Sequence, residues 1–399
     1  MSFPLPLPEP LRRALPPGTG VLLGLSGGVD SAVALAVLKE LGCRVECVTF
    51  RNFCYAEGQD TAGEQACCSL DAIDQARRLA VDAGAPHWVG DLVEPFRARV
   101  IDPFIAEYAQ GRTPNPCLSC NESVRFPELV RLAARQGCVF AATGHYARID
   151  RDGATPRLRR GLDPAKDQSY FLHRLDTALL GSLVFPLGWY AKDDVRAAAR
   201  ALALPVAERR DSQEICFVPD DDRSFLFADA GTAGAQAVAA ATTPGPIVDR
   251  GGRRLGTHRG LAHYTVGQRK GLGIAAPAPL YVLALQTDGN RLVVGPREGL
   301  LATRLVADRF VAQVPDLPER WPGPRDGPWA TVKPLVQVRH RHAGTAVAAW
   351  RWDGDRLEVE LAEPVAGAAP GQGLAIYDRD LVLGGGRLLA ADGAGTGGA

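Results

Sequence analysis

The sequence predicts an α/β fold, with an open parallel sheet in the first half of the chain and a small antiparallel barrel in the second half. Three observations support this. Apolar runs alternate with helical stretches up to about Arg209, an order typical of a parallel sheet covered on both faces. A stretch rich in Ala, Gly and Thr then marks a domain boundary. From Leu280 onward, short alternating segments separated by DG and GP turns favour a barrel.

The first half opens with a strand, a glycine-rich turn and a helix. Residues 21–25 form an apolar run, SGGVDS follows, and the helical pattern after it ends at Gly42. Because ligands bind at the carboxyl ends of strands in such sheets, this turn and the later glycine turn in GHY are candidate binding sites. The further elements expected in this half are strands over 45–50, 87–92 and 139–143 and a helix over about 62–83.

Length and composition bound the class of protein. The 399 residues suit two or three domains, and no run of about 18 uncharged apolar residues is present that could span a bilayer. The first twenty residues place their two arginines after the apolar part, the reverse of a secretory signal. The nine cysteines all lie between Cys43 and Cys216, unlike a secreted disulfide framework. We expect a cytoplasmic protein without a membrane span.

The formal net charge is zero, so an RNA partner has to be argued from local patches. Between Asp249 and Lys270 there are six Lys or Arg against a single acid, and residues 327–352 contain four Lys or Arg and no acid. Charge alone leaves two interpretations open, an RNA-binding surface or ordinary solvated faces.

The hexapeptide Ser26–Ser31, SGGVDS, is a candidate phosphate-binding loop. Glycines let the backbone approach a ligand closely, and the amides at a helix N-terminus favour an anion. The segment lacks the G-x-x-x-x-G-K-S/T pattern of NTPases that transfer a γ-phosphate. It resembles the pyrophosphate loop of enzymes that cleave ATP between the α and β phosphates. The plainer alternative is that Asp30 or Ser31 caps the helix and the glycines only make a tight turn.

Two prolines stiffen the segment TPNPCLSCN before Cys117 and Cys120. Rigid presentation suits a nucleophilic thiol, because a small misplacement of reacting atoms is costly. A single C-x-x-C also fits half a zinc site, a redox pair or two buried thiols. Cys216, in DSQEICF, fits a core position as well as a reactive one. The remaining cysteines in apolar segments are predicted to be core residues, namely Cys43, Cys47 and Cys138.

Seven motifs occur in the order found in the tRNA-specific 2-thiouridylase family, which the chain resembles from about Val21 to Tyr377. They are SGGVDS, TPNPCLSCN, ATGHYAR, KDQSYFL, DSQEICF, GTHRGLAHYTVGQRKGLGI and RHRH. The resemblance implies a Rossmann-like PP-loop ATPase domain, a small central tRNA-binding domain and a C-terminal antiparallel β-barrel. With the boundaries above, these are expected over 1–209, 210–295 and 296–390, followed by a disordered tail over 391–399.

The resemblance also implies an activity, cofactors and partners. A member of this family uses ATP and Mg²⁺ to adenylate the wobble uridine (position 34) of tRNA, and then transfers sulfur from a cysteine persulfide, giving 2-thiouridine, AMP and pyrophosphate. The expected partners are the anticodon arm of tRNAs for Lys, Glu and Gln, and a sulfur-relay protein or cysteine desulfurase. The chain is expected to act as a monomer.

The motifs further imply site residues. Cys216 corresponds to the persulfide carrier, and Cys120 to a nucleophile that can form a redox-active disulfide with Cys216. The positions that match ATP contacts are Gly24, Leu25, Ser26, Gly27, Gly28, Val29, Asp30, Ser31, Phe50 and Gly144. The target-base segment is Asn115, Pro116 and Cys117. The positions that match tRNA contacts are His145, Lys166, Asp167, Gln168, Arg339, His340 and Gln372.

The chain departs from the best-known members at Cys117, where they have an acid credited with activating the attacking group. A set of three thiols, Cys117, Cys120 and Cys216, opens an alternative in which they hold an iron–sulfur cluster with an open iron for inorganic sulfide. The additional thiols after the second strand could relay sulfur, bind a metal or do neither; they are Cys54, Cys67 and Cys68.

Simpler alternatives exist for some of these assignments. His145 also fits a locally hydrogen-bonded side chain, and Lys166 and Arg339 also fit ordinary surface charges. Two other functions compete at the level of the whole chain, another PP-loop ligase such as an amidotransferase-like synthetase, and a tRNA-binding module with a vestigial nucleotide loop. The intact hexapeptide together with the paired thiols argues against both.

Overall fold

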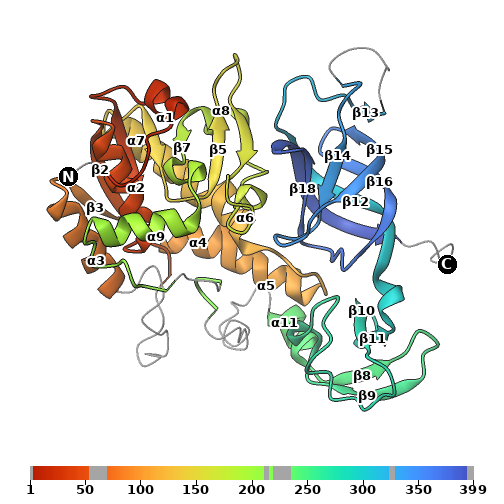
Figure 1. Cartoon of the computed structure of the whole chain (residues 1–399). Coiled ribbons are helices and arrows are strands. Elements are labelled where there is room, and N and C mark those ends of the chain that lie inside the picture. Colours follow the sequence, from red (N-terminus) through yellow and green to blue (C-terminus); the bar gives the residue numbers. More distant parts are fainter. Residues whose placement is uncertain (1–2, 54–69, 211–214, 219–234, 323–328, 393–399) are drawn as a thin grey trace. The chain divides into compact units, whose positions relative to one another are not determined.

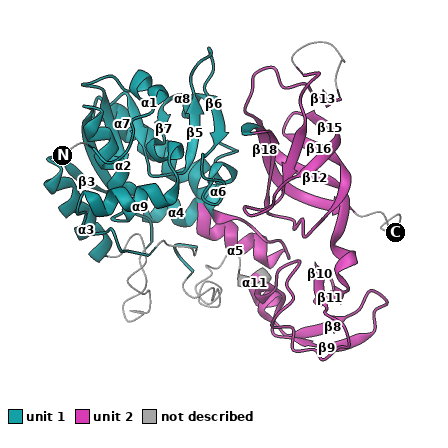
Figure 2. Ribbon diagram, viewed as in Figure 1, with its two compact units in different colours: residues 1–99, 117–221, 380–382 teal, residues 100–116, 222–379, 383–399 magenta. Residues whose placement is uncertain are grey.

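The computed structural model describes residues 3–53, 70–210, 215–218, 235–322 and 329–392. These residues fall into two compact units, coloured separately in Figure 2. The first unit consists of residues 1–99, 117–221 and 380–382, and the second of residues 100–116, 222–379 and 383–399. The domain boundaries expected from the sequence at 209/210 and 295/296 stay predictions.

The first unit contains a five-stranded parallel sheet with helices around it, which confirms the predicted α/β fold (Figure 1). Its strand order is β3-β2-β1-β4-β7. The strands are β1 (Gly20–Gly24), β2 (Arg44–Arg51), β3 (His87–Asp91), β4 (Phe140–Ala142) and β7 (Leu183–Val184). The main helices are α1 (Glu9–Ala14), α2 (Val29–Glu40), α3 (Leu70–Asp82), α7 (Phe126–Arg135), α8 (Thr177–Gly181) and α9 (Lys192–Ala201).

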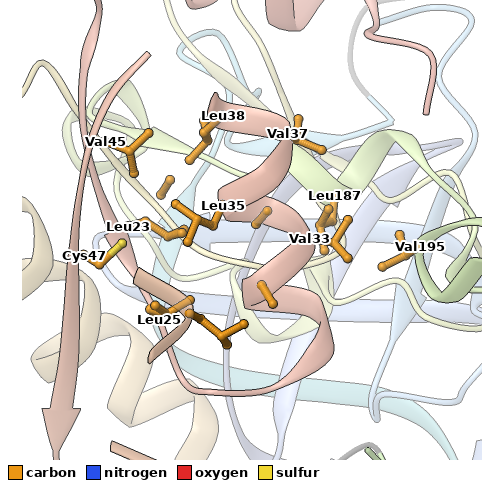
Figure 3. Close-up of a cluster of buried hydrophobic side chains, with 14 of the residues drawn as sticks. Leu23, Leu25, Val33, Leu35, Val37, Leu38, Val45, Cys47, Leu187 and Val195 are labelled. Carbon is orange, nitrogen blue, oxygen red and sulfur yellow. The ribbon is translucent and has the colours of Figure 1, made fainter. Parts of the chain in front are cut away.

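Helix α2 is buried on most sides, as Figure 3 shows. Leu35 and Leu38 lie in one cluster with Leu23 of β1, Val45 of β2 and Val195 of α9. A helix that is apolar around its circumference is stable only where it is covered on several sides, and each buried Leu or Val contributes about 1.5–3 kcal/mol relative to exposure. This packing holds the N-terminus of α2 at the end of β1.

Three cysteines belong to the core of this unit, as predicted. Cys43, Cys47 and Cys138 are all buried. Burial raises the pKa of Cys43 to about 11 and that of Cys47 to about 12, so both stay protonated and unreactive at neutral pH. Cys54, Cys67 and Cys68 lie outside the described residues, as do residues 62–69 of the expected helix and the first four residues of DSQEICF.

A β-hairpin completes the first unit. It consists of β5 (Ala147–Asp150) and β6 (Arg157–Arg160), and Arg159 pairs with Leu381 from the far end of the chain. The preceding Asp380 accepts hydrogen bonds from Arg148 Nη2 (2.7 Å) and Arg159 Nη1 (2.8 Å). These contacts explain why a three-residue piece near the C-terminus belongs to this unit.

The second unit contains a four-stranded sheet of order β10-β11-β8-β9 and a six-stranded antiparallel barrel, which confirms the predicted barrel. The barrel order is β12-β16-β15-β14-β17-β18, and β12 also pairs with β18, which closes it. The small sheet is β8 (Gly245–Val248), β9 (Arg254–His258), β10 (Tyr281–Gln286) and β11 (Arg291–Gly295). The barrel strands are β12 (Leu301–Ala312), β14 (Pro334–Gln337), β15 (Thr345–Asp353), β16 (Arg356–Ala366), β17 (Gly373–Asp378) and β18 (Leu381–Asp392), with the short β13 (Arg320–Trp321) beside β15.

Two helices pack together in the second unit, α5 (Asp102–Ala109) and α11 (Ala235–Thr242). α6 (Pro116–Cys120) follows α5 along the chain. Strand β18 continues to Asp392 and so includes the first two residues of the expected tail, and residues 393–399 lie outside the described part of the chain.

Candidate active site

The loop between β1 and α2 carries the SGGVDS hexapeptide. Gly27 has φ +70°, and a Cβ at this position would lie 2.6 Å from the carbonyl oxygen of Ala72, so glycine is required here. Gly28 is the N-cap of α2, which begins at Val29 and has twelve residues. The first turn of such a helix presents unpaired N–H groups and the positive end of the helix dipole. The loop therefore has the geometry of an anion site.

Ser31 fixes the shape of this loop. Its hydroxyl donates to the carbonyl oxygen of Gly28 (3.0 Å) and accepts from the backbone N–H of Ser26 (3.2 Å). No side chain caps the helix at Gly28. The interpretation of Asp30 or Ser31 as a helix cap is therefore wrong, because the Ser31 hydroxyl bridges the loop and the Asp30 carboxylate binds other side chains.

Asp30 is held by two side chains from distant parts of the chain. Lys192 Nζ lies 2.6 Å from Asp30 Oδ1 and 2.8 Å from Oδ2, and the Tyr146 hydroxyl donates to Oδ1 at 2.7 Å. The Lys192 side chain is 6% exposed and that of Asp30 is 32% exposed. The ammonium also lies over the Tyr146 ring. The Lys192 ammonium is thus anchored by the Asp30 carboxylate directly beside the first turn of α2.

Two more residues, from distant parts of the chain, contact the loop. A Cβ on Gly144, which follows β4, would lie 3.0 Å from Asp30 C and Ser31 N, so the backbone of Gly144 lies against the loop. Arg209 Nη1 donates to the carbonyl oxygen of Gly27 at 3.0 Å. Phe50 lies near the carboxyl end of β2, where a Cβ on Gly90 of the neighbouring strand would lie 2.8 Å from its ring.

The KDQS segment holds the main chain of Tyr146 in place. Gln168 exchanges hydrogen bonds with the main chain of Tyr146, through Tyr146 N to Gln168 Oε1 (2.9 Å) and Gln168 N to Tyr146 O (2.8 Å). The buried Asp167 carboxylate accepts from Arg160 Nη1 and from the backbone N–H groups of Gly161 and Ser169. Asp167 and Gln168 therefore shape the backbone that presents the Tyr146 hydroxyl to the loop.

His145 fits the simpler alternative of a locally bonded side chain. Its Nδ1 lies 2.7 Å from the Thr143 hydroxyl, and its ring packs against Phe126 and Phe185. The ring is partly exposed, yet burial and the nearby Arg125 lower its pKa to about 3. A contact of His145 with RNA would therefore use a hydrogen bond of the neutral ring. Lys166 is half-buried in the same loop region.

The C-x-x-C thiols of α6 have different environments. Cys117 is exposed and Cys120 is buried. Burial raises the pKa of Cys120, and the charge and backbone N–H of Arg125 offset part of that rise. Cys216 is half-buried, and the adjacent Phe217 is fully buried with its ring packed edge-on against Phe96. The proposed disulfide between Cys120 and Cys216 stays a prediction.

The three thiols do not form a ligand set in this structure. Among the described residues, which include all three, no group of three or more His, Cys, Asp or Glu side chains is arranged to hold a metal ion. Cys120 is buried while Cys117 is exposed. The arrangement of Cys117, Cys120 and Cys216 therefore does not fit an iron–sulfur cluster.

In the second unit, the candidate target-base and tRNA residues lie in two places. Asn115 is half-buried and Pro116 is buried. Gln372 Nε2 donates to the carbonyl oxygen of Thr113 at 2.8 Å, close in sequence to that segment. Arg339 is exposed and His340 is half-buried, in the turn after β14.

The stretch rich in Arg over 249–270 borders a cavity of about 740 Å³ in the second unit. Arg250, Arg253 and Arg254 lie on its wall, and apolar side chains including Ile274 and Leu280 also line it. Arg253 is ion-paired with Asp249 while its side chain stays 79% exposed. Arg250, Arg253 and Arg254 are all exposed and place positive charge on this part of the surface.

Sequence reasoning missed Lys192, Tyr146 and Arg209. Lys192 offered one signal, because it is the first residue of α9, where a positive charge opposes the helix dipole. A lysine at that position indicates that its charge is paired with an acidic side chain elsewhere in the protein. Tyr146 lies within the GHY turn that was singled out, but its link to Asp30 depends on the tertiary fold.

Comparison with known proteins covers nearly the whole chain. Family models match at residues 19–220 (tRNA methyl transferase HUP domain), 236–296 (tRNA methyl transferase PRC-barrel domain) and 318–388 (aminomethyltransferase beta-barrel domain). The tRNA-specific 2-thiouridylase MnmA of Geobacter metallireducens is 43% identical over 374 residues, covering 93% of this chain and 97% of that one. The protein of the same name from Geotalea uraniireducens is 42% identical over 370 residues, covering 92% and 94%.

The U34-tRNA thiolase NcsA from Methanococcus maripaludis, solved with its [4Fe-4S] cluster, is a more distant match. It is 20% identical and covers 57% of this chain and 66% of that one, and the TM-score of 0.33 is too low to bear on fold or chemistry. No helix within the described ranges is long and apolar enough to cross a membrane.

Proposed function

The chain belongs to the tRNA-specific 2-thiouridylase family of tRNA-uridine 2-sulfurtransferases, and we propose that it thiolates the wobble uridine through an adenylated intermediate and a cysteine persulfide. The observation that carries the proposal is the anion-binding loop before α2, with Asp30 fixed by Lys192 and Tyr146. The same chain also presents the paired thiols of α6.

In the first step, the uridine O2 attacks the α-phosphorus of ATP. A bond forms between O2 and the α-phosphorus, the bond to the β-phosphate oxygen breaks, and pyrophosphate leaves. The α2 amides and Lys192 would stabilise the negative charge that develops on the phosphates. The carboxylate of Asp30 suits Mg²⁺, which binds nucleotides through phosphate oxygens and one or two carboxylates. Mg²⁺ would neutralise phosphate charge when bound.

In the second step, the terminal sulfur of a Cys216 persulfide attacks C2 of the uridine, and AMP leaves with the former O2. The Cys120 thiolate then attacks Cys216 Sγ. The bond between Cys216 and the transferred sulfur breaks, its electron pair stays with that sulfur, and 2-thiouridine is released. The two cysteines end as a disulfide, which an external thiol reduces. A persulfide is polarizable and acidic enough to serve as this nucleophile.

The buried Cys120 agrees with a late role in this sequence. Because burial raises its pKa, the thiol stays protonated, and therefore unreactive, until the substrate complex provides a base. The exposed Cys117 occupies the position of an acid in the best-known members, and we assign it no proton transfer. The route through an iron–sulfur cluster is not adopted, because the three thiols are not arranged as ligands.

We further propose that the tRNA anticodon arm is held by exposed cations, Arg339 and the Arg250–Arg254 cluster among them, with Lys166 contributing near the catalytic loop. The target base would be turned out of its stack to reach the enzyme, as base chemistry requires. The substrates would be tRNAs for Lys, Glu and Gln, the sulfur would come from a relay protein or cysteine desulfurase, and the chain would act as a monomer.

The test is anaerobic purification with iron and acid-labile sulfide analysis, paired with thiolation of unmodified tRNA. The variants are Cys117→Ala, Cys120→Ala and Cys216→Ser, with pyrophosphate release measured alongside. The proposal expects metal-free protein to be active, Cys117→Ala to survive, and Cys216→Ser to release pyrophosphate without forming 2-thiouridine. Activity that tracks cluster content and needs all three thiols would establish the cluster route instead. Full activity of Cys216→Ser would favour another adenylating ligase.

A further inference from the structure

The main chain of Thr113 is held from both sides by a turn of the C-terminal barrel. Its N–H donates to the carbonyl oxygen of Pro370 at 2.7 Å, and its carbonyl oxygen accepts from Gln372 Nε2 at 2.8 Å. Thr113 is buried at this contact. Both backbone groups of one residue are therefore satisfied by residues more than 250 positions away in the chain.

The turn that holds Thr113 is itself fixed to β18. Gly371 N donates to Leu388 O at 2.7 Å, and Leu388 N donates to Gln372 O at 2.8 Å. Gly371 has φ +95°, and a Cβ there would lie 2.9 Å from both C and O of Thr113 and 3.0 Å from Pro114 N. The two backbones are therefore in direct contact, and any side chain at residue 371 would force them apart.

An ion-pair network links α5, the helix before Thr113, to β18. Arg387, next to Leu388, donates from Nη1 to Glu107 Oε1 of α5 at 2.7 Å and from Nε to Asp308 Oδ1 of β12 at 2.9 Å. Glu107 also accepts from Arg112 Nη2 at 2.8 Å. The side chains are only 13–28% exposed, so screening by water is reduced. Residues 107–113 are thus anchored to the barrel at two places.

From Thr113, only a short, stiff segment leads to the exposed thiol. Pro114 and Pro116 have φ fixed near −65°, and each restricts the residue before it to extended conformations. Pro116 is also the first residue of α6, which contains Cys117. Few backbone torsions remain free between Thr113 and Pro116, so the anchored position of Thr113 limits the positions that Asn115 and Pro116 can take up before the thiol.

We propose that the barrel turn Pro370–Gln372 positions the target-base segment, with the Gln372 side chain acting on the Thr113 carbonyl. Resemblance to the family implies a tRNA contact at this glutamine, and the bond from its amide nitrogen to Thr113 adds a second role, within the protein. The proposal rests on the proposed function in one respect, the role of residues 115–117 as the target-base segment.

Positioning of the target-base segment and binding of tRNA are separate roles with different kinetic effects. A positioning residue changes the rate of the chemical step, because reacting atoms misplaced by about 1 Å can cost about 100-fold in rate. Removing a side chain that binds tRNA in the ground state changes affinity instead. The two roles of Gln372 are therefore separated by measuring tRNA affinity and single-turnover rate on the same variant.

The experiment uses the full-length protein as wild type, Gln372→Leu and Gly371→Ala. The matched control is Gln313→Leu, another buried glutamine, at the end of β12. Three quantities are measured: the iodoacetamide alkylation rate of Cys117 without tRNA, by mass spectrometry of the tryptic peptide 113–125; the tRNA dissociation constant; and the single-turnover thiolation rate. The alkylation measurement does not depend on the enzyme's activity.

We expect Gln372→Leu and Gly371→Ala to change the Cys117 alkylation rate by roughly 3-fold or more, because the segment opens locally, while Gln313→Leu leaves it as in wild type. Thiolation should slow about 10-fold or more with tRNA affinity within about 2-fold. An unchanged alkylation rate in both variants, or a loss of tRNA affinity in Gln372→Leu that accounts for the loss of rate, overturns the proposal. If wild type does not thiolate tRNA, the proposed function fails, and the alkylation rates still decide whether the barrel holds the segment.

Discussion

Replacing Lys192 by Met tests whether the buried ion pair with Asp30 maintains the phosphate loop. Met keeps the length and apolar stem of the side chain and removes its charge. Breaking a buried pair costs about 3–5 kcal/mol, because the remaining charge loses its partner. The Asp30 side chain is 32% exposed and retains the Tyr146 hydroxyl, so water offsets part of this cost. We expect a loss of about 2–3 kcal/mol in the free energy of unfolding.

The same substitution should slow the ATP-dependent step. If the loss carries over fully to the transition state, kcat/KM for pyrophosphate release falls about 30- to 160-fold. Unfolding is followed by intrinsic fluorescence in urea, and pyrophosphate by a coupled assay with unmodified tRNA. Lys39→Met is the control, because Lys39 is an exposed lysine on the same helix as Asp30, and its stability should change by no more than about 0.5 kcal/mol.

A double-mutant cycle with Asp30→Asn decides whether the two side chains act together. The pair interaction predicts a coupling energy of about 2 kcal/mol in stability, because the second substitution removes the charge that the first left unpaired. Additive effects within about 0.5 kcal/mol would refute the reasoning, and Lys192 would then act by packing alone.

Three further predictions address the loop, the core thiols and the basic cavity. Gly144→Ala places a Cβ 3.0 Å from the loop backbone and should raise KM for ATP, whereas Gly153→Ala, with no atom within 4 Å, should match wild type; equal kinetics of the two would contradict the close approach. Because the folded-state pKa of Cys47 is raised from 9.0 to about 12, its contribution to the unfolding free energy should be constant below pH 9 and fall as pH rises toward 12. Cys47→Val should reduce that fall in urea titrations, and an unaltered pH profile would exclude the thiol as its source. Replacing Arg253 and Arg254 by Ala should weaken tRNA binding and lower the salt slope by about one unit for each phosphate interaction that is removed, and a slope equal to that of wild type would remove this cavity from the tRNA interface.

Much of the fold could be predicted because it depends on local patterns. The apolar runs of β1 and β2, the helix that ends before Gly42, and the alternating strands of the barrel are all encoded in consecutive residues. The burial of Cys43, Cys47 and Cys138 followed from the apolar segments around them. The place of the SGGVDS loop between a strand and a helix was also predictable, and Gly27 has a φ of +70°, a conformation that glycine adopts readily.

Other properties depend on residues that only the folded chain brings together. Lys192 and Asp30 are 162 positions apart, and Gln372 and Thr113 are 259 apart, so no local pattern connects them. Residues chosen by motif as RNA contacts proved to have internal partners, such as Asp167 with Arg160 and Gln168 with Tyr146.

The sequence by itself determined the parallel-sheet domain, the barrel, the position of the phosphate loop and the set of candidate thiols. Tertiary packing decided which charge fixes Asp30, which thiol of α6 is buried, and which part of the chain holds Thr113. The physical reason is that periodicity and glycine content act over a few residues, whereas a buried ion pair or a satisfied carbonyl depends on which distant surfaces pack together.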